Sequence, residues 1–265
     1  DEETACNALE NMLVDKAFGS AGLEVLVEEC LEGEEVSVFA LCDGETVVPL
    51  VAAQDHKRIF DGDLGPNTGG MGAYTSPVFY TAEIHQQVME EILQPIVKAM
   101  ASEGRTYKGV LFLGLMLTAK GPRVLEFNVR WGDPEAQVVL PMLATDFLAM
   151  TEAAVDGNLN NIPIAFEPGS CVCVVLASGG YPAEYETGQV ITGLDNVSPD
   201  TMIFHGGTRR VGSMVVTNGG RVISVVCKGE TIAQAIEKVY REIRHLDFAG
   251  AHYRKDIGAR MLKRP

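Results

Sequence analysis

Three polar side chains stand at alternate positions in the otherwise apolar segment Leu125–Arg130. Alternate residues of a β-strand share one face, so we expect Glu126, Asn128 and Arg130 to point the same way and the intervening apolar side chains to pack on the other side. A carboxylate and an amide oxygen suit Mg²⁺, which takes few protein ligands and keeps phosphate and water oxygens. A neighbouring arginine offers a planar fork for phosphate or carboxylate. The segment predicts a metal–triphosphate site; the alternative is an edge strand with an ordinary solvated face.

An acidic run between residues 27 and 35 joins the end of one predicted strand to the start of the next. A hinge of this kind can offer backbone groups to an adenine edge, and carboxylates to an amino group and to ribose hydroxyls. The alternative is a charged turn on an acidic surface.

The stretch Asp55–Pro77 is long, polar and rich in glycine. It opens with the compact basic run DHKR at residues 55–58 and continues as GDLGPNTGGMGAY at residues 62–74. Glycines let backbone N–H groups approach an anion closely, although the run does not match the GxxxxGK[ST] loop. A loop of this length is usually either functional or disordered, and Met71 and Tyr74 give it side chains that can pack.

The periodicity and turn residues predict the elements that must position these groups. We expect a first helix around residues 5–13, strands at 23–29, 35–42 and 46–52 with an Asp43-Gly44 turn, a helix at 82–101 bent by Pro95, and paired strands at 109–118 and 123–129. A helix should start at Asp133-Pro134-Glu135, with Asp133 as its cap, and another should cover 147–155 and stop at Gly157.

The sequence pattern changes near residue 168, where short predicted strands separated by glycine turns begin. We expect strands at 171–178, 189–193, 202–205, 213–217 and 221–227, followed by a helix that Thr231 caps. The runs HGGT at 205–208 and NGGR at 218–221 are interpreted as turns, either of which could reach a substrate. We place a domain boundary near residue 168.

Composition limits the class of protein. The 265 residues carry a net charge of −15, which argues against a protein whose main task is to grip a nucleic-acid backbone. The chain has no run of about 18 apolar residues and no secretory signal at its start, so we expect no membrane partner and a cytoplasmic location. The six cysteines lack a CxxC pair and are expected to be reduced and mostly buried.

Together these segments resemble the glycinamide ribonucleotide synthetase (phosphoribosylamine–glycine ligase) family of the ATP-grasp superfamily. The matching stretches, in order from about residue 25 to 258, are VEECLEGEEVS, AQDHKR, GPNTGGMGAY, GVLFLGLML, VLEFNVRWGDPE, HGGT, NGGRV and YRKDIG. The resemblance implies an α+β chain with an ATP-grasp fold. Residues 1–37 would be part of the lid subdomain, 38–167 the large subdomain and 168–265 a small β-rich C-terminal domain.

The resemblance also implies roles for individual residues. Glu126 and Asn128 would be ligands of Mg²⁺ or Mn²⁺, and Arg130 and Lys57 would be catalytic. ATP would contact Glu28, Glu29, Cys30, Leu31 and Glu35. The substrates would contact Asp55, His56, Arg58, Asn67, Thr68, Gly69, Gly70, Met71, Gly72 and Asp133.

In the family's reaction, which belongs to purine biosynthesis, the glycine carboxylate takes the γ-phosphate of ATP, and the amine of 5-phosphoribosylamine then displaces phosphate. The family begins with an α/β domain and a lysine-containing lid loop, which would precede Asp1 and pack against this chain. We therefore expect this chain alone to bind ATP weakly and to have little activity. The strand at 111–116 carries no second metal carboxylate. Alternatives are another ATP-grasp carboxylate–amine ligase or carboxylase, and a non-catalytic nucleotide-binding fragment of a multifunctional purine enzyme.

Overall fold

The computed structural model describes residues 1–262 and divides into two compact units, one from Asp1 to Glu32 and one from Gly33 onward. The first unit contains the helix α1 (Glu2–Leu13), whose N-terminus is capped by the Asp1 side chain accepting from the Thr4 N–H at 2.8 Å. A single short 3₁₀ turn (Gly19–Gly22) follows. The helix prediction is confirmed.

The strand predicted at residues 23–29 is wrong. Leu26 and Val27 are 79% and 81% exposed, and in the part of the chain that the structure describes no strand pairs with this segment. A strand is stabilised by a hydrogen-bonded neighbour, so an apolar run without one stays irregular.

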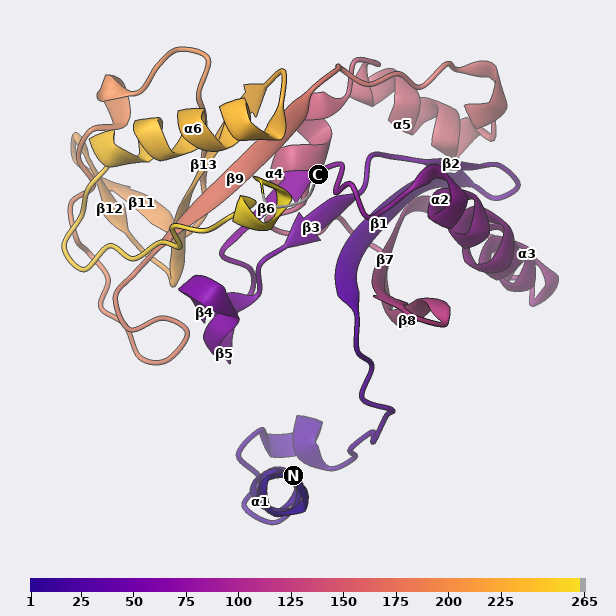
Figure 1. Cartoon of the computed structure of the whole chain (residues 1–265), viewed down its shortest axis with the longest axis horizontal. Helices are drawn as coiled ribbons and strands as arrows, with labels where there is room; N and C mark the ends of the chain where they lie inside the picture. Colours follow the sequence, from indigo (N-terminus) through magenta and orange to yellow (C-terminus); the bar gives the residue numbers. More distant parts are fainter. Residues whose placement is uncertain (263–265) are drawn as a thin grey trace. The chain divides into compact units, whose positions relative to one another are not determined.

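Within residues 33–262, a nine-stranded antiparallel sheet forms the framework of the second unit (Figure 1). Its path runs β10-β13-β9-β6-β3-β1-β7-β8, and β2 pairs with β1. The strands are β1 (Glu34–Asp43), β2 (Val47–Pro49), β3 (Ala53–Asp55), β6 (Gly72–Thr75), β7 (Lys108–Thr118), β8 (Gly121–Asn128), β9 (Ser170–Ala177), β10 (Met202–His205) and β13 (Arg221–Gly229). Two small hairpins, β4 (Arg58–Phe60) with β5 (Leu64–Asn67) and β11 (Thr208–Val211) with β12 (Met214–Thr217), lie outside this sheet.

Both faces of the sheet are covered, because its central strands are apolar on both sides. The helices α2 (Ala82–Val88) and α3 (Gln94–Ser102) pack on the Val36, Val38 and Ala40 side of β1. The helices α4 (Ala136–Val139) and α5 (Phe147–Asp156) pack on the opposite side, against Phe39 and Leu41. The helix α6 (Ile232–Glu242) covers β9 and β13 (Figure 1). The last helix is α7 (Ala259–Leu262).

Most of the predicted strands are present, but some segments differ from the prediction. The segment predicted as a strand at 46–52 forms only β2, whose last residue, Pro49, pairs with Ala40. The strand predicted at 189–193 is wrong, because only the isolated bridges of Val190 and Thr192 form there. The polar stretch 55–77 is not one long loop, because it contains β4, β5 and β6. The strand β11 is not among the predicted strands.

The helix predicted at 82–101 is interrupted by a π-helical turn at Met89–Leu93, where the Gln94 N–H bonds to Met89 O. Pro95 follows in the first turn of α3; a proline inside a helix removes one hydrogen bond and crowds the carbonyl four residues earlier, which a wider turn relieves. The predicted span of α5 and its end at Gly157, which lies in the left-handed region, are confirmed. The structure adds a cap at its start, where the Asp146 side chain accepts from the Ala149 N–H. Thr231 caps α6 as predicted.

Asp133 does not cap the helix that follows it, contrary to the prediction. The helix α4 starts only at Ala136, after a cis Asp133–Pro134 bond, and Glu135 at its N-cap position makes no side-chain cap. The Asp133 carboxylate instead accepts from Gln137 Nε2 at 2.8 Å and pairs with Arg221 Nη1 at 3.2 Å.

The sheet is continuous across residue 168, because β6 pairs with β9. The boundaries proposed at residues 37 and 167 stay predictions. None of the helices within residues 1–262 is long and apolar enough to span a membrane.

Four of the cysteines are buried (Cys42, Cys171, Cys173 and Cys227), whereas Cys6 and Cys30 are exposed. Burial raises the pKa of Cys42 and of Cys171 to about 12, and it also raises the pKa of Cys173 and Cys227.

Because the thiolate is the reactive form, we expect only Cys6 and Cys30 to react quickly with a disulfide reagent at pH 8 in the native protein. Spectrophotometric thiol titration measures this, and all six thiols should react in guanidinium. The double variant Cys6→Ser/Cys30→Ser should lose the fast phase. More than two fast thiols in the native protein would contradict the burial described.

Candidate functional site

Four of the polar residues singled out in the sequence lie on one face of the sheet: Glu35, Asp55, Glu126 and Asn128. Ser37 of β1 pairs with Gly114 of β7, which pairs in turn with Glu126 of β8. Residues directly opposed on antiparallel strands point to the same face, so these three form a row across the sheet. Glu35 and Asp55, at alternate positions of β1 and β3, belong to the same face.

Glu126 and Asn128 share a face as predicted, because they occupy the alternate paired positions opposite Gly114 and Phe112. A Cβ at Gly114 would lie 3.0 Å from Glu126 Cγ, so the Glu126 side chain passes directly over this glycine. Any larger residue at 114 would push the carboxylate aside. Arg130 lies beyond the end of β8, is exposed, and donates to Trp131 O at 3.1 Å.

The apolar face of β8 does not pack as expected. Phe127 is 42% exposed and Val129 is 74% exposed, because β8 is the edge strand and α3 covers it only in part. Both line an open apolar groove of about 210 Å³ beside α3.

Lys57 is joined to the hinge residue Glu35. Its Nζ lies 2.5 Å from Glu35 Oε2, and both side chains are about two-fifths exposed (41% and 43%). Burial would lower the pKa of Lys57, but the hydrogen bond and charge of Glu35, with the charges of Asp55 and Glu126, outweigh it and raise the pKa. Lys57 is therefore a fixed positive charge that is paired with the predicted nucleotide residue Glu35 and interacts electrostatically with the predicted metal ligand Glu126.

Two carboxyl groups, Asp55 and Glu135, lie in the dry region behind Lys57. Burial and the negative charge of Glu135 raise the pKa of Asp55 well above its usual range. Burial also raises the pKa of Glu135, which accepts from Ser37 Oγ at 2.9 Å. Two like charges in a poorly solvated region disfavour double ionisation, so this pair retains a proton more readily than a free carboxylate does.

A cavity of about 280 Å³ opens on this face. It is lined by Gly33, Glu34, Glu35, Gln54, Asp55, Lys57, Arg58, Asp63, Asn67, Met116 and Arg260. The cavity brings together five predicted site residues. It adds Arg260, which sequence reasoning missed because its place depends on folding of the C-terminal segment back onto the site.

The side chain of His56, which is predicted to contact substrate, is buried inside the protein. It is 2% exposed, its ring packs against Tyr74 at a centroid distance of 5.8 Å, and neither ring nitrogen has a hydrogen-bond partner among residues 1–262. Burial, with the nearby charges of Arg254 and Arg260, lowers the pKa of His56 to about 3. The ring is therefore neutral at physiological pH.

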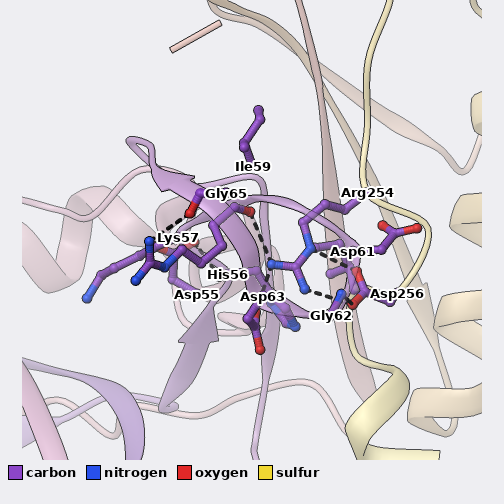
Figure 2. Close-up of polar contacts among 12 residues, drawn as sticks. Asp55, His56, Lys57, Ile59, Asp61, Gly62, Asp63, Gly65, Arg254 and Asp256 are labelled. Atoms are coloured by element: carbon purple, nitrogen blue, oxygen red, sulfur yellow. Dashed lines mark hydrogen bonds and ion pairs between the residues drawn. The ribbon is translucent and has the colours of Figure 1, made fainter. Parts of the chain in front are cut away.

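Arg254 fastens the hairpin β4–β5 to the C-terminal segment (Figure 2). The arginine side chain is 1% exposed and donates from Nε and Nη2 to both carboxylate oxygens of Asp256, each at 2.8 Å. Its Nη1 donates to Asp63 Oδ1 at 2.9 Å and to Arg58 O at 3.1 Å. Such a bidentate, charge-assisted arrangement fixes geometry as well as contributing energy.

Further bonds join the same two segments. Asp256 Oδ2 accepts from the Gly62 N–H at 2.8 Å, and Asp61 Oδ1 accepts from the Lys255 N–H at 2.8 Å. Arg58 itself donates to Gly65 O at 2.7 Å across its own hairpin.

The glycine-rich loop at residues 67–72 uses its amides within the protein. The Thr68 N–H donates to Lys57 O, the Gly70 N–H to Thr68 Oγ1 and the Met71 N–H to His56 O, at 2.7, 3.0 and 2.8 Å. These amides are therefore already bonded within the protein and do not form the expected anion-binding loop of free backbone N–H groups. Met71 and Gly72 are buried, whereas Asn67 and Gly69 are exposed.

Position 70 requires glycine because Pro134 and Asp55 approach its Cα too closely for a side chain to fit. Gly70 has a φ of +115°, and a Cβ there would lie 2.4 Å from Pro134 Cδ and 2.7 Å from Asp55 Oδ1. The loop therefore presses directly on the Asp133–Glu135 turn and on the acidic pair.

The predicted adenine residues Glu28, Glu29, Cys30 and Leu31 belong to the first unit, in a segment without helix or strand. Glu35 belongs to the second unit. Their joint contact with a nucleotide stays a prediction.

Comparison with known proteins bears on this site. Residues 1–136 match the family model "Phosphoribosylglycinamide synthetase, ATP-grasp (A) domain", and residues 171–260 match the C domain of the same synthetase. The chain belongs to the phosphoribosylglycinamide synthetase family. The predicted resemblance and the ATP-grasp fold class are confirmed.

Members of the phosphoribosylglycinamide synthetase family resemble the chain over almost all of its length. It is 48% identical to the phosphoribosylamine–glycine ligase of Halalkalibacterium halodurans over 98% of the chain, and 44% identical to that of Vibrio cholerae over 99%. These matches cover 60% and 62% of the two relatives, so the chain spans about 60% of their length.

Solved structures agree. The phosphoribosylamine–glycine ligase of Thermotoga maritima superposes with a TM-score of 0.78 at 37% identity, covering 87% of this chain and 57% of that one. The biotin carboxylase domain of the Hydrogenobacter thermophilus 2-oxoglutarate carboxylase has a TM-score of 0.68 at 14% identity, covering 96% of this chain and 54% of that one, and shows the shared fold alone.

The ion pair that fastens the 58–63 segment makes stability depend on pH. Partial burial would raise the pKa of Asp256, but the hydrogen bonds and charge of Arg254 and the Gly62 N–H outweigh it and lower the pKa to about 2, from an ordinary value near 3.8. Because the folded-state pKa is the lower one, the ionised group stabilises the fold above about pH 4, and this contribution is lost as the pH falls toward about 2.

Asp256→Asn should lower the free energy of unfolding at pH 7, and its difference from the parent protein should shrink at pH 3. Urea unfolding at both pH values measures this. The matched control is Asp195→Asn, at an exposed carboxylate, which should change little. An equal deficit for Asp256→Asn at pH 7 and pH 3 would rule out the ion pair as its cause.

Proposed function

We propose that the protein takes part in ATP-dependent ligation of glycine to 5-phosphoribosylamine, which forms glycinamide ribonucleotide, ADP and phosphate in purine biosynthesis. The observation that carries the proposal is 48% identity to a phosphoribosylamine–glycine ligase over 98% of the chain. The position of Glu35, Asp55, Glu126 and Asn128 on one face of the sheet supports it.

The reaction has two displacements. A glycine carboxylate oxygen attacks the γ-phosphorus of ATP, the bond to the bridging oxygen breaks, and ADP leaves with that electron pair. The amine nitrogen of 5-phosphoribosylamine then attacks the acyl carbon of glycyl phosphate, phosphate leaves, and the nitrogen loses a proton. The first step needs positioning and neutralisation of charge more than a protein nucleophile. Lys57 and Arg130 are the cations that we assign to it.

Glu126 and Asn128 would hold Mg²⁺, or Mn²⁺. Their carboxylate and amide oxygens fit an ion that takes one or two protein ligands and leaves its other positions to phosphate and water. When bound, the ion neutralises charge on the triphosphate. Gly114 leaves room for the Glu126 side chain to lie across β7, and the negative charge of Glu126 also acts on Lys57.

The remaining assignments follow the family. The segment Glu28–Leu31 would contact adenine and Glu35 the ribose. The cavity residues Asp55, Arg58 and Asn67, the loop Thr68–Gly72 and Asp133 would surround the substrates. His56 would support this loop from the interior, where its backbone bonds to Gly72 and Met71.

We further propose the division into a partial lid at 1–37, a large subdomain at 38–167 and a C-terminal domain at 168–265. The location proposed is cytoplasmic, with no nucleic-acid or membrane partner. The part of the ligase relatives beyond the matched 60% would include an N-terminal domain that packs against this chain. That coverage also favours the second candidate, a nucleotide-binding fragment that does not turn over by itself.

Hydroxylamine traps an acyl phosphate, so the chain incubated with Mg-ATP, glycine and hydroxylamine should form glycine hydroxamate and an equal amount of ADP, slowly. Colorimetric detection of the hydroxamate measures this step without the second substrate. Acetate in place of glycine should give only background. Glu126→Gln should reduce the rate at least about tenfold, equivalent to roughly 1.4 kcal/mol in the barrier, and the exposed Glu103→Gln should not.

ATP binding without any glycine-dependent hydroxamate would favour the non-catalytic fragment over the ligase. Hydroxamate formed equally well from acetate would point to a different carboxylate–amine ligase.

A further inference from the structure

A second cavity, of about 330 Å³, lies on the C-terminal side of the glycine-rich loop, in the same unit as the first. It is lined by Asp133, Gln137, Tyr181, Phe204, His205, Gly206, Gly207, Arg221, Val222, Ile223 and Ser224. These residues come from four segments far apart in the sequence. They include His205, Gly206 and Gly207 of one glycine turn that the sequence analysis left open and Arg221 at the end of the other.

The walls of this second cavity hold the loop that borders the first. Arg221 Nη1 donates to Gly69 O at 2.8 Å and to Asp133 O at 2.6 Å. The Tyr181 hydroxyl accepts from the Gly69 N–H at 2.9 Å. Since Gly70 also presses against Asp55, the second cavity lies beside the reacting centre proposed above rather than apart from it.

Glycines make the cavity possible. A Cβ at Gly207 would lie 2.6 Å from Gly219 Cα, so the two turns pack backbone against backbone. A Cβ at Gly220 would lie 2.2 Å from the Tyr181 ring, which this contact holds with its hydroxyl at Gly69. Side chains at these positions would close the cavity or displace the loop.

The cavity presents both a cation and an unsatisfied acceptor. The Arg221 side chain is 24% exposed, and although its Nη1 is fully used, its Nε and Nη2 donate to no group among residues 1–262. Gln137 donates from Nε2 to Asp133 Oδ1 at 2.8 Å, which fixes the orientation of its amide. Gln137 Oε1 is then left buried with no donor in the described part of the chain. A buried acceptor without a partner is costly, and a hydroxyl group of a ligand would satisfy it.

We propose that this second cavity binds the sugar-phosphate part of the amine substrate. Hydroxyl groups would donate to Gln137 Oε1 and to the Asp133 carboxylate, and the phosphate would accept from the free edge of Arg221, with His205 at the rim. This places the phosphate at Arg221 and not at the hairpin residue Arg58. The choice of a pentose phosphate as ligand rests on the proposed function. The inference that the ligand carries both an anionic group and hydroxyl groups rests on the side chains that line the cavity.

The test is calorimetric titration of ribose 5-phosphate into the chain, without ATP. We expect saturable binding, weakened at least about fivefold by Gln137→Met and about tenfold by Arg221→Lys. The matched controls Gln86→Met and Arg209→Lys, at exposed positions, should bind as the parent does. Ribose and inorganic phosphate, each alone, should bind more weakly than ribose 5-phosphate. Gln137→Met should keep or raise the thermal midpoint, which separates lost recognition from unfolding.

Absence of saturable binding, equal binding by Gln137→Met, or inorganic phosphate binding as tightly as ribose 5-phosphate would overturn the assignment. The trapping assay with hydroxylamine needs no sugar, so failure of this site and failure of the proposed ligase activity are separate results.

Discussion

Arg254 joins two distant parts of the chain, because its partners Asp63 and Arg58 lie 191 and 196 residues before it, and the candidate site depends on that junction. The polar segment from residue 55 to 72 has few apolar side chains of its own; Ile59 and Met71 are buried, but most of the hairpin β4–β5 is exposed. A segment of this composition cannot bury enough surface to hold one conformation by itself. The guanidinium of Arg254 bonds to Asp256, Asp63 and the Arg58 carbonyl. These bonds hold the segment in one conformation where hydrophobic packing is too limited to do so.

A second arginine acts at the other end of the same segment. Arg221 bonds to the Gly69 and Asp133 carbonyls and so fixes the loop against the turn that carries Glu135. Both arginines belong to the C-terminal third of the chain, whereas the residues that they position belong to the ATP-grasp region. The pairing of β6 with β9 makes this possible, because it joins the two regions within one sheet. The C-terminal region is thus part of the site's construction.

The sequence predicted the parts of the site that depend on local periodicity. The alternation of Glu126 and Asn128 is a property of any strand, and the end of α5 at Gly157 and the cap of α6 depend on residues within one turn of the helix. The predicted cap at Asp133 is wrong because the competing partner of its carboxylate, Arg221, lies 88 residues away in the sequence. The interior position of His56 and the arrival of Arg260 at the first cavity are likewise products of long-range packing. The segment at 23–29 has the composition of a strand but lacks a neighbouring strand in the described residues.

The central claim is that one face of the sheet holds Mg-ATP through Glu126 and Asn128. Calorimetric titration of Mg-ATP into the chain, up to millimolar concentration, tests it most directly, alongside Glu126→Ala, Asn128→Ala and the exposed control Glu103→Ala. The account predicts weak but saturable binding that is unchanged in Glu103→Ala and at least about tenfold weaker, or roughly 1.4 kcal/mol, in each of the other two variants. Binding that is the same in all four proteins, or absent from the parent, would contradict it.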